Sequence, residues 1–116
     1  MNRFLVIDPD AAAAQKLGLE CLERGAGVVI AENVCQGVRA LLNDAVSLIV
    51  VDAGVIRLTA REQATLFERV APGIPVVVVI RPDAPLEGRV ALELAGFRVL
   101  SRPVAAADLL DKVNVG

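Results

Sequence analysis

Near its start the chain reads Phe4-Leu5-Val6-Ile7-Asp8, and the same arrangement returns at Leu48-Ile49-Val50-Val51-Asp52. Each stretch is a short run of aliphatic and β-branched residues that ends directly in an aspartate. Such runs are typical of strands that are buried on both faces of a parallel sheet. In a doubly wound α/β sheet, ligands bind outside the carboxyl ends of the strands. The two aspartates are therefore expected at the functional end of the sheet.

Strand and helix signals alternate along the whole chain, without a linker, a repeat or a low-complexity segment. Asp10 and Asn33 are predicted to cap the first two helices, and Thr59 to Glu62 has the spacing of a capping box. The predicted strands cover about residues 3–7, 27–31, 47–51, 75–80 and 97–101. The predicted helices cover about residues 11–24, 34–42, 60–70, 85–95 and 105–113.

This alternation predicts a (βα)5 fold in a single domain over residues 1–116, with helices on both faces of a parallel sheet in three α/β/α layers. Right-handed crossovers leave few topologies, and the flavodoxin-like strand order 2-1-3-4-5 is the commonest for this number of strands. In that order the strands that end at Asp8 and Asp52 are neighbours. A guanidinium, Arg102, follows the last predicted strand and is expected at the same end of the sheet.

Composition excludes several classes of function. Hydrophobic residues make up 55% of the chain and the mean hydropathy is +0.59, but the longest β-branched run, Val76–Ile80, is far shorter than the ~18 residues that span a bilayer. Asp8 interrupts the first hydrophobic stretch, so no leader is predicted and a cytoplasmic location is expected. The net charge of −2 and the three phenylalanines as sole aromatic residues argue against nucleic-acid binding.

The two cysteines offer no sign of a thiol-based site. The chain has no histidine, and neither Cys21 nor Cys35 has the spacing of a metal ligand or a nucleophile. Both are therefore expected to be small buried hydrophobic residues. Leu22 is expected beside Cys21 on the inward face of the first helix, and Leu109, Leu110 and Val113 on that of the last.

Carboxylates at strand ends make an oxygen site that suits Mg²⁺. An aspartate beside such a metal can attack a phosphoryl donor and become an acyl phosphate. The alternative is a structural role, in which Asp8 and Asp52 hold their loops and pair with Arg102.

In these features the chain resembles the receiver domains of two-component response regulators over residues 3–113. The resemblance depends on the two strands that end in aspartate, on Ile74-Pro75-Val76-Val77, on Ala95-Gly96 and on Arg102-Pro103. It implies that Asp52 is the phospho-acceptor, that Asp8 is the first acidic residue of a Mg²⁺ site, and that Arg102 replaces the family's lysine. It also implies a switch position at Val99 and a sensor histidine kinase, or another signalling protein, as partner.

The chain departs from this pattern at the site itself. Pro9 stands where the family has its second acidic residue, so one of three carboxylate ligands is missing. Ile80 and Arg81 replace a hydroxyl residue and a small residue. We expect Arg102 to face Asp52. Arg81 either faces the carboxylates and crowds the pocket or points into solvent.

Three interpretations follow. The first is an atypical receiver domain, not an enzyme, in which phosphorylation is weak or lost, Mg²⁺ is weakly bound or absent, and signalling proceeds by protein–protein contact. In that case the helix over residues 85–95, the strand over 97–101 and the helix over 105–113 would form the docking or dimerisation surface. The second is a conventional receiver domain in a phosphorelay, with Asp52 phosphorylated by a histidine kinase. The third is a small-molecule module, which the loop Asp8-Pro9-Asp10 disfavours because, without a metal, it would repel a phosphate.

Overall fold

The computed structural model describes residues 2–114 and contains five strands and five helices in strict alternation. Each element lies within one or two residues of its predicted position. The strands are β1 (Asn2–Ile7), β2 (Ala26–Ala31), β3 (Leu48–Asp52), β4 (Val76–Ile80) and β5 (Arg98–Ser101). The helices are α1 (Ala11–Glu23), α2 (Val34–Asn43), α3 (Ala60–Val70), α4 (Leu86–Leu94) and α5 (Ala106–Asn114).

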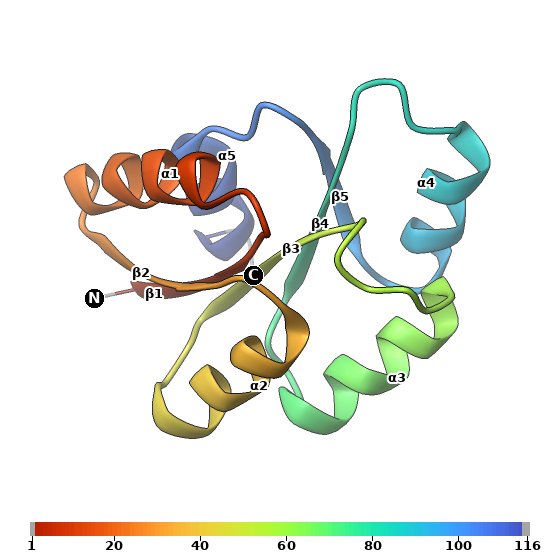
Figure 1. Ribbon diagram of the computed structural model, residues 1–116, viewed down its shortest axis with the longest axis horizontal. Helices are drawn as coiled ribbons and strands as arrows, with labels where there is room; N and C mark the ends of the chain where they lie inside the picture. The colour runs from red at the N-terminus through yellow and green to blue at the C-terminus, as the bar shows by residue number, and fades with distance from the viewer. Residues whose placement is uncertain (1, 115–116) are drawn as a thin grey trace.

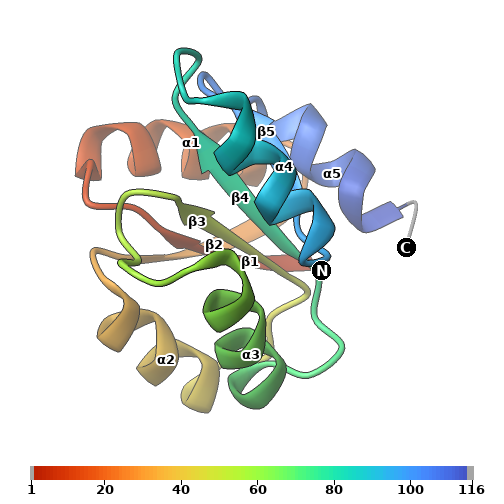
Figure 2. The same cartoon turned by 90° about the vertical axis from the view of Figure 1, so that its right-hand side faces the viewer.

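The strands form one sheet in the order β2-β1-β3-β4-β5, and all four neighbouring pairs are parallel. Helices α1 and α5 cover one face of the sheet, while α2, α3 and α4 cover the other (Figures 1 and 2). The predicted α/β class, the flavodoxin-like strand order and the three-layer arrangement are confirmed. Because β1 and β3 pair along their length, their carboxyl ends lie side by side.

The helices begin where their capping residues predict. The Asp10 side chain accepts a hydrogen bond from the backbone nitrogen of Ala13 at 3.1 Å, and Asn33 does the same for α2. The Thr59 hydroxyl accepts from the backbone nitrogen of Glu62, whose carboxylate accepts from that of Thr59, which completes the capping box. These bonds satisfy backbone donors that a helix leaves unpaired at its first turn.

Two hydrophobic clusters enclose the sheet. On β1, Phe4 and Val6 point toward α1 and α5, while Leu5 and Ile7 point toward α2, α3 and α4. All five residues of β4 are buried, as expected for a strand covered on both faces. On the α3 side, the rings of Phe67 and Phe97 meet edge to face at 6.2 Å between their centroids.

Two predictions about inward-facing residues are wrong. Leu22 is 59% exposed, because the buried face of α1 passes through Ala14, Leu17 and Cys21 and position 22 lies to its side. Cys35 is exposed in the first turn of α2, whereas Cys21 is buried as predicted. Leu109 is buried as well, and the side chain of Val113 lies outside the described residues. None of the helices between residues 2 and 114 has the length and apolar character that crossing a membrane requires.

The close packing of α2 on the sheet generates a stability prediction. A Cβ atom added at Gly37 would lie 2.6 Å from Cδ1 of the buried Ile7, whereas one added at Gly88 in α4 would meet nothing within 4 Å. Both alanine substitutions improve helix propensity, so their difference isolates the clash. We expect Gly37→Ala to be less stable than Gly88→Ala by about 1–3 kcal/mol of unfolding free energy in urea titrations. Equal stability would contradict this packing.

Candidate functional site

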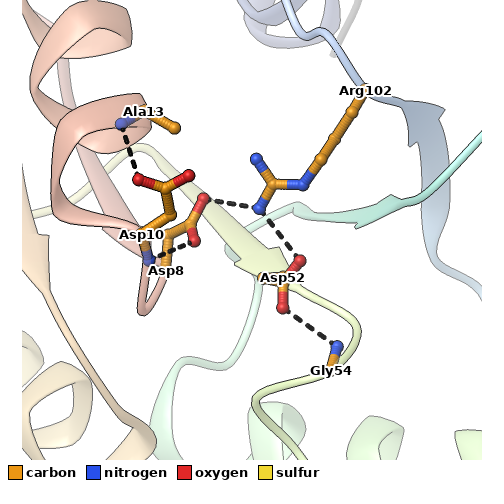
Figure 3. A network of polar contacts seen from close by, with 6 residues as sticks. All are labelled: Asp8, Asp10, Ala13, Asp52, Gly54 and Arg102. Carbon is orange, nitrogen blue, oxygen red and sulfur yellow. Dashed lines mark hydrogen bonds and ion pairs between the residues drawn. The ribbon is translucent and has the colours of Figure 1, made fainter.

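The sheet brings three of the predicted site residues together at the carboxyl ends of its strands. Asp8 directly follows β1, Asp52 is the last residue of β3, and Arg102 directly follows β5. Figure 3 shows the Arg102 side chain reaching between the two carboxylates. Its Nη2 atom donates to Oδ2 of Asp8 at 2.6 Å and to Oδ1 of Asp52 at 2.9 Å. One terminal nitrogen of the guanidinium therefore joins the ends of the two strands.

The second oxygen of each carboxylate also accepts a hydrogen bond. Oδ1 of Asp8 accepts from the backbone nitrogen of Asp10 at 2.9 Å, and Oδ2 of Asp52 accepts from that of Gly54 at 3.1 Å. The loops after β1 and β3 thus orient the carboxylates from one side while Arg102 holds them from the other. All four carboxylate oxygens have a donor within the protein.

Burial strengthens this network. The side chains of Asp8, Asp52 and Arg102 are 10%, 17% and 29% exposed, so water screens their charges only in part. Burial acts to lower the pKa of Arg102, but the hydrogen bonds and charges of Asp8 and Asp52 outweigh it and raise that pKa above its ordinary value. The Arg102 guanidinium is therefore held as a cation between the two carboxylates.

A cleft of about 340 Å³ opens at these three residues and extends between α1 and the loop that leads into α5. Lys16 and Glu20 of α1, which are not among the predicted site residues, line it as well. Their helical spacing places both on one side of α1, beside the buried Leu17, but it does not show that this side borders a cleft.

The remaining predicted site residues do not line this cleft. Ile80 and Val99 are buried in the cluster beneath α2, α3 and α4, on the other side of the sheet from the cleft. Pro9 is exposed, and Asp10 beside it turns to cap α1 instead of facing the carboxylates.

Arg81 does not join the carboxylates, and of its two alternatives the structure has the one in which it points into solvent. Its side chain is 78% exposed, and its Nε atom lies 3.6 Å from Asp83. An exposed position lets the guanidinium keep its hydration, which the half-buried cleft would remove.

The donor set fits Mg²⁺ poorly. This ion requires several oxygen ligands at about 2.0–2.1 Å in octahedral geometry. Here two carboxylates are available, each is already engaged by a guanidinium and a backbone amide, and the position next to Asp8 is a proline. Within residues 2–114, no group of three His, Cys, Asp or Glu residues is arranged to hold a metal ion.

Comparisons with known proteins identify the fold. No family model matches the chain. It is 27% identical over 111 residues to the transcriptional regulatory protein GlrR of Escherichia coli K12; the match covers 96% of this chain and 25% of that protein. The chain thus spans about a quarter of the length of the curated relatives it matches.

Solved structures give the fold. A CheY-like response regulator receiver domain from Methanospirillum hungatei JF-1 superposes with a TM-score of 0.80 and 25% identity, over 99% of this chain and 92% of that one. A response regulator from Burkholderia pseudomallei, solved with a phosphorylated aspartic acid, a calcium ion and citrate, gives 0.81 at 20% identity, over 97% and 66% of the two chains. The resemblance to response-regulator receiver domains is confirmed.

The bridge made by Arg102 generates a prediction about coupling. Each single substitution breaks the contact between Asp8 and Arg102, whereas the loss of the contact between Arg102 and Asp52 is common to both Arg102 variants and cancels in the cycle. A double-mutant cycle of Asp8→Asn and Arg102→Met should therefore give a coupling free energy of about 1–3 kcal/mol in urea unfolding.

The matched control is the exposed pair of Arg81 and Asp83. A cycle of Arg81→Met and Asp83→Asn should give a coupling within about 0.5 kcal/mol of zero, because water screens that pair. The bridge would be refuted as a stabilising contact if both cycles gave the same small value.

Proposed function

We propose that this chain, which has the fold of response-regulator receiver domains, is an atypical receiver domain in which phosphorylation of Asp52 is weak or lost. Its place in two-component signalling is supported by the receiver-domain structures it matches and by its relative GlrR. The observation that carries the atypical function is the Arg102 side chain between Asp8 and Asp52.

Arg102 supplies the positive charge that the two carboxylates require. Like charges at neighbouring strand ends repel each other, and a cation between them relieves the repulsion. A guanidinium joined to the chain is present at every Mg²⁺ concentration, and it is permanently charged. A metal ion that binds Asp8 and Asp52 has to displace it. Phosphotransfer that depends on the metal is weakened accordingly.

Two more residues act in the same direction. Pro9 removes a carboxylate that the resemblance to receiver domains leads us to expect in the metal site. Ile80 is buried in the core, so the end of β4 presents no hydroxyl group to the cleft. A phosphoryl group on Asp52 would therefore have fewer hydrogen-bond donors to stabilise it.

The conventional alternative retains one specific observation. Asp52 is present at the end of β3, and it lines an open cleft together with Lys16, which offers a second cation. In this interpretation a histidine kinase phosphorylates Asp52 with Mg²⁺. We favour the atypical function because the alternative requires Arg102 to leave both of its partners.

We further propose that the domain is not an enzyme and acts in the cytoplasm through protein–protein contact, with a sensor histidine kinase or another signalling protein as partner. Helix α4 supports a docking surface, because Leu86, Val90 and Leu94 follow one another at the spacing of a single helix face and are all exposed. The surface of α4, β5 and α5 would accept that partner or a second copy of the chain. We do not expect this domain to bind nucleic acid.

The test is intact-mass spectrometry after incubation with acetyl phosphate and Mg²⁺. The parent chain should show little or no added phosphoryl group. The double variant Pro9→Asp, Arg102→Lys restores the expected carboxylate and lysine, and should gain one phosphoryl group. Adding Asp52→Asn to the double variant should abolish that gain.

The opposite result would restore the conventional interpretation. In that result most of the folded parent chain gains one phosphoryl group, and its Asp52→Asn variant gains none. Circular dichroism of each variant confirms that a lack of labelling does not arise from unfolding.

A further inference from the structure

Strand β2 is an edge of the sheet, and nothing in its sequence protects that edge. It reads Ala26-Gly27-Val28-Val29-Ile30-Ala31, with no charge and no proline. Edge strands usually carry such residues because their unpaired backbone groups can pair with another chain. The opposite edge, β5, is shorter and carries Arg98 and Ser101. The two edges of the sheet therefore differ in how well they resist pairing.

The register of β2 shows which backbone groups face outward. The backbone nitrogen of Asp8 donates to the carbonyl of Ala31 at 2.9 Å, so Ala31 points its backbone groups toward β1. In a parallel pair the residues that bond to the neighbour alternate along the strand. Gly27, Val29 and Ala31 therefore pair with β1, while Ala26, Val28 and Ile30 direct their amide and carbonyl groups away from the sheet.

An apolar flank of α1 lies beside this open edge. A Cβ atom at Gly18 would lie 3.7 Å from Val28 and 3.9 Å from Ile30, so this side of α1 faces β2. Leu22 lies one turn further along the same side, and Leu19 adjoins it. Leu19, Leu22 and Ile30 are 64%, 59% and 39% exposed. This flank is opposite the one that carries Lys16 and Glu20 into the cleft.

We propose that a second copy of this chain pairs with β2 in antiparallel orientation, extending the two sheets into one across a twofold axis. When the outward backbone groups of the two β2 strands hydrogen-bond to each other, Val28 lies opposite Val28 of the other copy. Ala26 then lies opposite Ile30 of the other copy. The α1 helices of the two copies then run side by side on one face, where Leu19 and Leu22 come together and lose their exposure to water.

Charge complementarity identifies the occupant as a second copy. Arg24 precedes β2 and Glu32 follows it, and both are exposed. Across the part of the chain that the structure describes, residues 2–114, neither takes part in an ion pair. Antiparallel pairing of two β2 strands places the Arg24 end of each beside the Glu32 end of the other, which forms two symmetric ion pairs. This inference does not depend on the proposed function.

The first experiment combines sedimentation velocity with hydrogen exchange over a range of protein concentrations. Interference optics are needed because the chain has no tryptophan or tyrosine. We expect a dimer that increases with concentration, with protection of the Val28 and Ile30 amides increasing in parallel. Their neighbours Gly27 and Val29, already bonded to β1, should change little.

Charge reversal tests the symmetry. Arg24→Glu and Glu32→Arg alone should each raise the dimer dissociation constant about tenfold, because like charges then face each other at both ends. An equimolar mixture of the two variants should dimerise as the parent does. In the mixed dimer the glutamate introduced at position 24 meets the arginine introduced at position 32, and the other end keeps its native pair. Damage to the fold would not be repaired by mixing. Arg61→Glu, at an exposed position on α3, is the matched surface control and should leave dimerisation unchanged.

Three results would overturn the proposal. One is a chain that stays monomeric at millimolar concentration. Another is a dimer that Leu94→Glu abolishes and the charge reversals do not affect, which would assign the contact to α4. The last is a monomer whose Val28 and Ile30 amides become protected only when an extended apolar peptide is added, which would assign the edge to a peptide.

Discussion

The ion bridge from Arg102 to Asp8 and Asp52 is the contact on which the functional end of this domain depends. Pairing of β1 with β3 forces two aspartates into adjacent, largely buried positions, where they repel each other unless a cation lies between them. Arg102 provides that cation from the end of β5, two strands away from β3 in the sheet. The bridge therefore joins the loops after β1, β3 and β5 across the end of β4.

A cation that belongs to the chain has a different consequence from a cation that arrives from solution. Bound Mg²⁺ would make the charge of the site depend on the surroundings, and its ligands would be free when it leaves. Arg102 pairs with both carboxylates without any ion from solution, and backbone amides occupy their remaining oxygens. The site is consequently suited to holding one conformation, which is the property that the proposed function requires.

Much of this arrangement could be predicted from the sequence, because it depends on backbone pattern. Strand runs that end in aspartate, helix caps at Asp10 and Asn33, and the parallel order of five strands all follow from local chemistry and chain topology. The positions of flexible surface side chains do not follow from these features. Arg81 turns to Asp83 in solvent, and Leu22 lies beside the buried face of its helix. Lys16 and Glu20 line the cleft because of how α1 packs near the α5 loop, which periodicity alone does not determine.

The most direct test of the account is the affinity of the parent chain and of Arg102→Met for Mg²⁺, measured by titration calorimetry. If Arg102 occupies the place of the metal ion, its removal leaves two carboxylates without a cation. The variant should then bind Mg²⁺ at least about tenfold more tightly than the parent. Equal affinity, or tighter binding by the parent, would show that Arg102 does not compete with the ion and would contradict the central claim.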